Sequence, residues 1–178
     1  ENERLKGKIE EVLAGSTVGR TKHLAYERLD VHQLLRDCSD SFQFKVKERD
    51  GSIDLQFDAK DSVVLGDRSL LATAINNLID NAEKYSPQNP RILLRTRDLD
   101  GKTISIEIVD KGIGIDPRMS EKVFEKFFRI SPGNVHNVKG FGLGLSFVRE
   151  VISSHRGKVK MIGALSKGTQ VQILLTRS

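Results

Sequence analysis

The sequence predicts an α+β fold, a two-layer α/β sandwich in which helices cover one face of a mixed sheet. Three segments alternate apolar and polar residues, as half-buried strands do, at 53–57, 104–108 and 171–175. Three longer segments space their apolar residues at the period of an amphipathic helix, at 30–47, 67–85 and 142–155. Because strand and helical segments interleave, one sheet with helices on a single face is the economical arrangement.

The first 26 residues are predicted to be a separate appendage. Residues 1–14 form a short predicted helix that stops at Gly15. Its apolar stripe consists of Leu5, Ile9, Val12 and Leu13. A helix of this length is marginal alone, so we expect the stripe to pack on an upstream segment or on a second copy of the chain. Residues 17–26 are predicted to be a linker, which divides the chain into 1–26 and 27–178.

The elements of the larger unit have their own start and stop signals. The turn sequence Asp50-Gly51 follows the first helix, Asp67 can cap the second, and Gly157 ends the third. Their apolar stripes are Val31, Leu34, Leu35, Cys38 and Phe42, then Leu71, Ile75, Leu78, Ile79 and Ala82, then Val148, Val151 and Ile152. Further strands at 92–96 and 158–161 complete the predicted sheet.

The composition indicates one compact globular domain. Of the 178 residues, 38% are apolar and 30% are charged, unlike a disordered or a membrane chain. No apolar run approaches the roughly 18 residues of a membrane span, and no leader opens the sequence. The chain starts at Glu1 within a charged helical pattern, so we expect it to be part of a longer protein. A single cysteine, Cys38, excludes an internal disulfide and a multi-cysteine metal site.

The net charge of +5 suits two kinds of anionic partner, a nucleic acid or a small polyanion such as a nucleotide. Arg91, Arg95 and Arg97 share one side of a predicted strand. We interpret this stripe as a solvated sheet face rather than a track for a phosphate backbone, and expect no nucleic-acid partner.

A line of polar residues runs beside the apolar stripe of the 67–85 helix. Asn77 and Asn81 are one turn apart, and Lys84 and Tyr85 follow. Asparagine has no packing reason to recur there, whereas its amide oxygen suits Mg²⁺. Lys84 would set an ammonium against phosphates, and Tyr85 would form a flat wall beside a base or ribose. Taken alone, a solvated helix edge explains the same residues.

A first glycine segment follows the strand at 104–108. Asp110 ends that strand and precedes Gly112 and Gly114. A carboxylate there can accept a hydrogen bond from an exocyclic amine such as N6 of adenine, and glycines permit positive φ and close approach of a ligand. Taken alone, this pattern is more often a turn than a nucleotide site.

A second glycine segment opens the 142–155 helix. Its candidate residues are Lys139, Gly140, Gly142, Leu143 and Gly144. Glycines at a helix start leave N–H groups free to hold phosphates, with support from the helix dipole. The spacing matches neither the P-loop nor the Rossmann pattern.

An aromatic segment lies between the two glycine segments. Phe124, Phe127 and Phe128 precede a stretch without apolar period at 131–139. We interpret the stretch as a lid over a ligand, and a surface loop tethered by the aromatic side chains is the alternative. Arg129 would meet a terminal phosphate or pair with a nearby carboxylate.

In this order and these contexts, the four segments resemble the N, G1, F and G2 boxes of the histidine kinase catalytic domain, a Bergerat or GHKL fold shared with gyrase, Hsp90 and MutL ATPases. Residues 77–86 and 140–145 match especially closely, and the resemblance covers 30–176. It implies that ATP and Mg²⁺ bind between the asparagine helix and the lid. The γ-phosphoryl group would then pass to a histidine of a dimerisation and phosphoacceptor domain, and on to the receiver aspartate of a response regulator.

The resemblance also implies roles for single residues. Asn81 would bind the metal, Asp110 would bind N6 of adenine, and Gly168-Thr169 would support that aspartate. The implied catalytic residues are Asn77, Lys84 and Arg129. The implied nucleotide-binding residues are Asn77, Asn81, Lys84, Tyr85, Asp110, Gly112, Gly114, Lys139, Gly140, Gly142, Leu143, Gly144 and Thr169.

The sequence departs from the wider group at Asn77, where gyrase-like relatives carry a glutamate that activates water. This favours phosphoryl transfer to an external nucleophile over hydrolysis. The family's acceptor motif is absent around each of the histidines, His23, His32, His136 and His155. Residues 1–26 therefore resemble the tail of the phosphoacceptor helix and its linker.

By the same resemblance, the chain would be a cytoplasmic domain of a membrane-anchored, homodimeric sensor, without membrane contact of its own. Two alternatives stay open. One is an ATP-driven clamp or hydrolase of the gyrase and MutL type. The other is a non-enzymatic interaction module with a degenerate nucleotide site.

Overall fold

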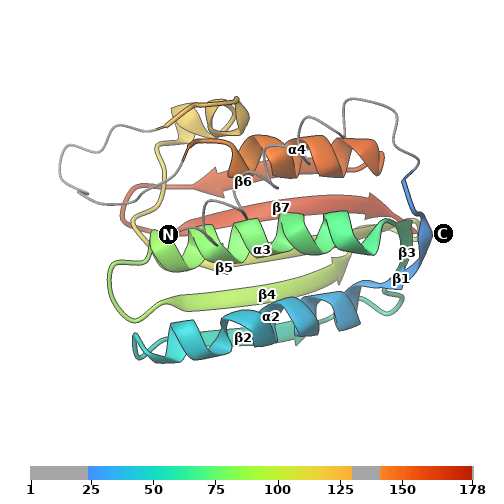
Figure 1. Cartoon of the computed structure of the whole chain (residues 1–178), viewed down its shortest axis with the longest axis horizontal. Coiled ribbons are helices and arrows are strands. Elements are labelled where there is room, and N and C mark those ends of the chain that lie inside the picture. Colours follow the sequence, from blue (N-terminus) through green and yellow to red (C-terminus); the bar gives the residue numbers. More distant parts are fainter. Residues whose placement is uncertain (1–23, 130–140, 178) are drawn as a thin grey trace, which may run out of the picture.

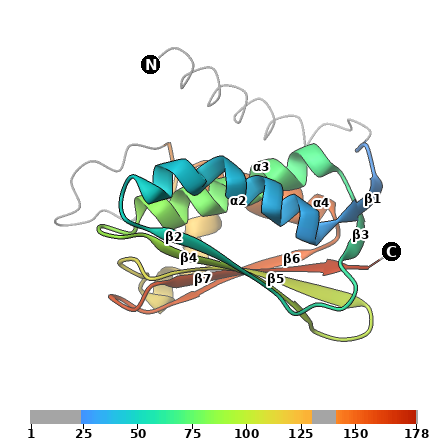
Figure 2. The ribbon, with the colours of Figure 1, turned by 90° about the horizontal axis from the view of Figure 1, so that it is seen from below.

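The computed structural model describes residues 24–129 and 141–177 and confirms the predicted α+β sandwich. Figure 1 shows α3 lying between α2 and α4, and Figure 2 shows these three helices on the same face of the sheet. The elements in chain order are β1 (Glu27–Asp30), α2 (Val31–Lys47), β2 (Ser52–Phe57), β3 (Val63–Gly66), α3 (Arg68–Lys84), β4 (Arg91–Asp98), β5 (Thr103–Asp110), η1 (Pro117–Met119), η2 (Lys122–Phe124), α4 (Gly144–Ser154), β6 (Lys158–Gly163) and β7 (Thr169–Thr176).

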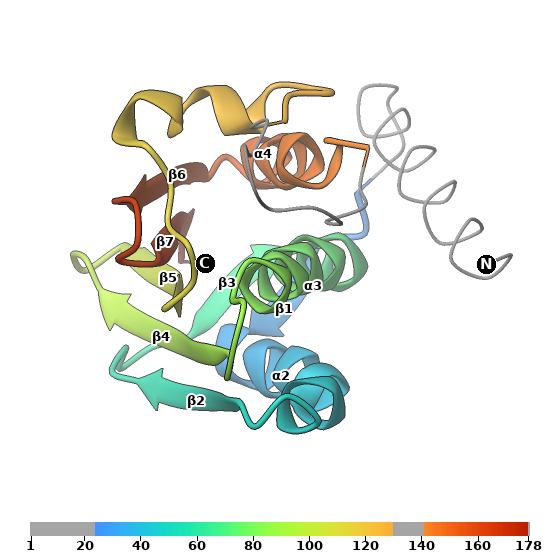
Figure 3. The same ribbon diagram turned by 90° about the vertical axis from the view of Figure 1, so that its left-hand side faces the viewer.

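The main sheet is mixed, as predicted. Its strand order is β2-β4-β5-β7-β6. β2 runs parallel to β4, whereas β4, β5, β7 and β6 pair antiparallel. The inward residues of β5, Ile104, Ile106 and Ile108, are buried in one core with the apolar stripes of the helices. Figure 3 shows the two layers end-on, so the core lies between them.

The outer face of the sheet carries the arginine stripe. Arg91 and Arg97 are exposed, and Arg95 pairs with the Glu107 carboxylate of the neighbouring strand. This agrees with the interpretation of the stripe as a solvated sheet face. Cys38 is buried in the core, as expected, and burial raises the pKa of its thiol to about 11.

A second sheet of two strands was not predicted. β1 pairs antiparallel with β3, and Val64 of β3 also bridges to Arg177 near the C-terminal end. Strands of four residues show too little alternation to be separated from a loop by periodicity. The 3₁₀ helices η1 and η2 were not predicted either, because three residues make a single turn and show no helical period. The predicted helix at 1–14 lies outside the described residues. Within the described part of the chain, no helix combines the length and apolarity of a bilayer span.

His155 joins the end of α4 to the start of α3. The Asp67 carboxylate caps α3 as predicted, accepting from the N–H of Leu70 at 3.1 Å. The N–H of Asp67 in turn donates to Nε2 of His155 at 2.9 Å. Because Nε2 accepts, the ring proton sits on Nδ1, which lies 2.7 Å from the Val151 carbonyl oxygen and donates to it. The buried imidazole thus links the N–H of the α3 N-cap to the last turn of α4, where the Val151 carbonyl also accepts from the N–H of His155 and from the Ser154 hydroxyl.

Replacing His155 with leucine is expected to lower the free energy of unfolding by about 2 kcal/mol, because the N–H of Asp67 loses its acceptor. Urea unfolding measures the change. The matched control is Tyr26→Phe, which removes a bond from an exposed hydroxyl to the Ser154 carbonyl in the same cluster. The control should lose less than about 1 kcal/mol. Equal stability of His155→Leu and the wild type would contradict the capping role.

Candidate functional site

The asparagine residues of α3 lie on its half-buried flank. Asn77 donates its amide N–H to the Thr73 carbonyl at 3.1 Å, which leaves its Oδ1 open. Nothing in residues 24–129 and 141–177 hydrogen-bonds to the side chain of Asn81. Two neutral amide oxygens one turn apart are therefore available to a hard cation.

Lys84 and Tyr85 end the same helix. Lys84 forms an ion pair with Asp80 one turn earlier, so its ammonium must leave that partner to reach a phosphate. Tyr85 is the C-cap residue and is 42% exposed. Asp80 also pairs with Lys45 of α2 at 3.1 Å.

Asp110 is a buried carboxylate at the end of the central strand, 8% exposed. Its Oδ1 accepts from the N–H of Gly112 at 2.8 Å and from the N–H of Thr169 at 3.2 Å. Burial raises the pKa of the Asp110 carboxyl, and the bonds from Gly112 and Thr169 oppose that shift. A buried carboxylate oriented by two main-chain donors can present its second oxygen to a ligand donor in a fixed direction.

The Asp110 loop packs directly on the end of α3. The N–H of Ile113 donates to the Tyr85 carbonyl at 3.0 Å. A Cβ on Gly112 would lie 2.4 Å from that same oxygen, so only glycine allows the approach. Gly114 has φ +70 and packs against the Ala164 carbonyl on the far side of the loop.

The second glycine segment forms the start of α4. Gly142 has φ +71, and its carbonyl accepts from the N–H of Phe127 at 2.9 Å. Leu143 is the N-cap, and Gly144 begins the helix. The predicted contacts Lys139 and Gly140 and the predicted lid at 131–139 lie outside the described residues.

The aromatic segment splits into a buried and an exposed part. Phe124 lies in a small apolar cluster with Ile115 and Val123, whereas Phe127 is exposed and meets Gly142 through its backbone. Of the two, only Phe124 is thus fixed by the apolar packing of the structure. Arg129 follows this segment and is exposed.

The motifs meet at one end of the molecule. In Figure 1 the C-terminal end of α3 and the N-terminal end of α4 lie at the same end, because the two helices run antiparallel. The bonds to the Tyr85 carbonyl and to Thr169 bring the Asp110 loop to that end as well. One residue there, Arg49, had no predicted role, since no local pattern relates it to partners 34 to 38 positions away.

Comparison with known proteins gives one family. Residues 66–178 match the family model of the histidine kinase-, DNA gyrase B- and HSP90-like ATPases. The sensor protein RprX of Bacteroides fragilis is 38% identical over an alignment of 178 residues, which covers 98% of this chain and 34% of RprX. The chain thus spans about a third of that relative.

Two solved structures share the fold. The mycobacterial sensor histidine kinase MprB has 29% identity and a TM-score of 0.72, over 85% of this chain and 97% of that one. Full-length ShkA in complex with AMPPNP has 22% identity and a TM-score of 0.85, over 98% of this chain and 36% of that one. The ShkA likeness bears on the fold alone. Since the family model matches well over half of the chain, the protein belongs to the histidine kinase-, DNA gyrase B- and HSP90-like ATPases.

Proposed function

We propose that the chain is the ATP-binding catalytic domain of a two-component sensor histidine kinase. It would transfer the γ-phosphoryl group of ATP to a histidine on the dimerisation domain, for onward transfer to a response-regulator aspartate. The observation that carries the proposal is the buried Asp110, whose carboxylate is held by two main-chain N–H groups beside the asparagine helix. That arrangement suits an exocyclic amine on a flat base.

The residues present fit Mg²⁺ bound together with the phosphates. The open amide oxygen of Asn81 is a neutral, hard donor, with Asn77 one turn away. One or two protein ligands suffice, because Mg²⁺ takes its remaining ligands from water and phosphate oxygens. When bound, the ion would neutralise phosphate charge. Lys84 and Arg129 are the cations that we assign to the phosphates, and Lys84 would exchange its Asp80 partner for them.

Phosphoryl transfer is favoured over hydrolysis, because α3 carries no unpaired carboxylate that could act as a base for water. Asn77 stands where a basic glutamate would, and an amide cannot take a proton from water. The two carboxylates of the helix, Asp80 and Glu83, are both ion-paired with Lys45 of α2, and these pairs do not depend on Lys84. Glu83 is also 3% exposed. Without a free carboxylate on α3, the site can position and stabilise a phosphoryl group for an external nucleophile.

The partners follow from this reaction. They are a phosphoacceptor domain of the same protein in a homodimer and a receiver domain. We place the chain on the cytoplasmic side of a membrane-anchored sensor, where ATP is available.

The decisive test is transfer from radiolabelled ATP to a supplied hairpin that carries the acceptor histidine. Asn81→Ala should lower the rate by about 30-fold, as loss of a metal-positioning group does. ADP binding without Mg²⁺ should stay unchanged. Asn76→Ala is the matched control, because this amide lies on the same helix and its buried Oδ1 has no hydrogen-bond partner within the described residues. Equal rates in Asn81→Ala and Asn76→Ala would refute the assignment, and rapid ATP turnover without the hairpin would favour a hydrolase.

A further inference from the structure

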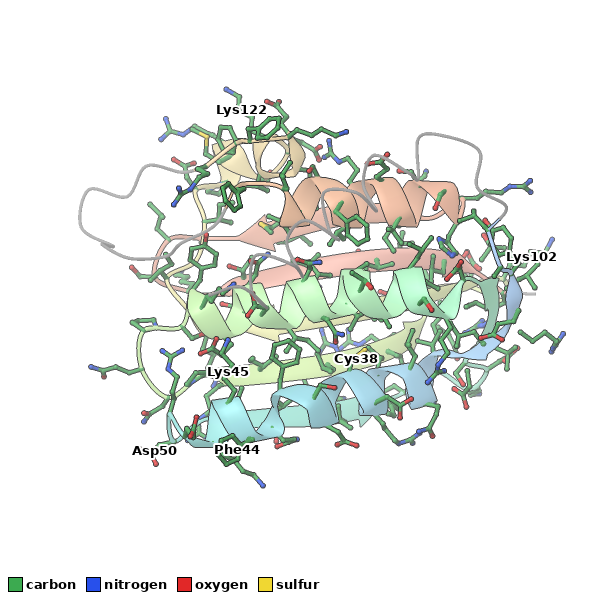
Figure 4. The ribbon with its side chains drawn as sticks, in the orientation of Figure 1. Cys38, Phe44, Lys45, Asp50, Lys102 and Lys122 are labelled. Atoms are coloured by element: carbon green, nitrogen blue, oxygen red, sulfur yellow. The ribbon has the colours of Figure 1, made fainter. Side chains whose placement is uncertain are left out.

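Arg49 lies in the turn after α2 and hydrogen-bonds to the C-terminal end of α3. Its Nη1 donates to the Glu83 carbonyl at 2.9 Å, and its Nη2 donates to the carbonyls of Ser86 at 2.5 Å and Pro87 at 3.2 Å. The guanidinium also pairs with the Glu83 carboxylate, whose other oxygen lies 2.6 Å from Nζ of Lys45. Figure 4 shows Lys45 close to this end of α3. The planar guanidinium of Arg49 thus hydrogen-bonds to three carbonyls and to one buried carboxylate.

These carbonyls flank Tyr85, whose own carbonyl supports the Asp110 loop. Glu83 precedes Tyr85 by two positions, and Ser86 and Pro87 follow it. The Tyr85 carbonyl accepts from the N–H of Ile113 at 3.0 Å. Gly112 packs so closely on it that a displaced oxygen would have to move the loop. The direction of the Asp110 carboxylate therefore depends on where the turn after α3 lies.

We propose that Arg49 is a positioning residue for nucleotide recognition. It fixes the turn after α3 and, through the Tyr85 carbonyl, the loop that holds Asp110. The nucleotide part of this inference rests on the proposed function. A lysine in place of Arg49 keeps a cation for the buried Glu83, but a point charge cannot hold several carbonyls in one plane.

The chain offers a matched control at the other end of the molecule. The guanidinium of Arg177 likewise donates to two carbonyls, of Asp61 at 2.9 Å and of Asp100 at 3.0 Å, and forms an ion pair with the Asp98 carboxylate. Its own N–H donates to the Lys102 carbonyl, and Figure 4 shows Lys102 at the end opposite to Lys45. Arg177→Lys therefore makes the same chemical change away from the Asp110 loop.

The experiment compares Arg49→Lys with Arg177→Lys in two readouts. Amide hydrogen exchange of the ligand-free protein reports the Ile113 N–H, and calorimetry reports the Kd of ADP. Arg49→Lys should speed exchange at Ile113 about tenfold and raise the Kd about tenfold, the equivalent of one charged hydrogen bond. Arg177→Lys should leave both within about twofold, although it costs similar global stability.

Each outcome decides a separate point. Equal acceleration at Ile113 in both variants would show a general loss of stability and overturn the positioning role. Wild-type exchange and Kd in Arg49→Lys would overturn it too. If the wild type failed to bind ADP, the proposed function and the nucleotide part of this inference would fall, and exchange at Ile113 would still decide whether Arg49 positions the loop.

Discussion

Replacing Asp110 with asparagine is expected to weaken ADP binding by at least about 100-fold without unfolding the chain. The carboxylate oxygen Oδ1 accepts from two main-chain N–H groups, so the carbonyl oxygen of an asparagine must take that place. The new NH₂ group then occupies the position of Oδ2 and would face the amine of adenine. Both groups are hydrogen-bond donors, so no hydrogen bond can form between them. An acceptor buried for recognition discriminates strongly, because the mismatched pair finds no water to compensate.

Calorimetric titration with ADP measures the loss. Asp116→Asn is the control, because this carboxylate lies in the same loop, pairs with Arg118 and caps the turn η1. It should bind ADP like the wild type. Similar affinities of the two variants for ADP would contradict the assignment of Asp110 to adenine binding.

The stability of Asp110→Asn is expected to equal or exceed that of the wild type at neutral pH. Burial raises the pKa of the Asp110 carboxyl above its usual 3.8, so the folded state binds this proton more readily than the unfolded chain does. The stabilisation linked to protonation is complete below 3.8 and is lost as the pH rises through the raised pKa. Asparagine avoids that loss because it stays neutral. Thermal unfolding at neutral and acidic pH should show the advantage shrinking toward low pH.

Replacing Gly114 with alanine is expected to cost at least about 3 kcal/mol of unfolding free energy. The residue has φ +70, where an L side chain is strained, and its Cβ would lie 1.9 Å from the Ala164 carbonyl oxygen. That oxygen belongs to the backbone after β6, so relief requires the loop to separate from the β6–β7 connection. Urea unfolding measures the loss.

Gly101→Ala is the matched control for this loop. Gly101 lies in the connection between β4 and β5 with no positive φ, and a Cβ there would meet nothing within 4 Å. Its stability should change by less than about 0.5 kcal/mol. A Gly114→Ala protein as stable as Gly101→Ala would show that the loop can relax, and the argument for a rigid Asp110 loop would fail.

The elements that periodicity could predict are those long enough to show it. α2, α3 and the strands β2, β5 and β7 repeat their apolar residues several times, and the Asp67 cap is a local signal. β1 and β3 have four residues each, so no period emerges. The pairing of Lys84 with Asp80 could also be predicted, because it follows from an i, i+4 spacing that the sequence contains.

Part of the candidate site could be predicted from the sequence and part could not. The spacing of Asn77 and Asn81 and the position of Asp110 after a strand are visible in the sequence. The contact of Asp110 with Thr169 spans 59 residues, and the grip of Arg49 on Glu83 spans 34. The contact of Asp110 with Thr169 was suggested only by the resemblance to a family. No sequence pattern suggested the contact of Arg49 with Glu83. Contacts of this kind depend on sheet order and helix packing, which local patterns do not encode.

The distance along the chain between Asp110 and Thr169 also bears on how the protein folds. β4 and β5 form a hairpin that closes over a few residues, whereas pairing β5 with β7 must close the long segment that contains α4 and β6. Closing so long a segment carries an entropy cost that slows the step. The contact between Asp110 and Thr169 thus forms only once this long segment has closed. If the chain binds ATP as proposed, binding to the completed site would stabilise the folded state by mass action, so ATP would also raise the share of native protein.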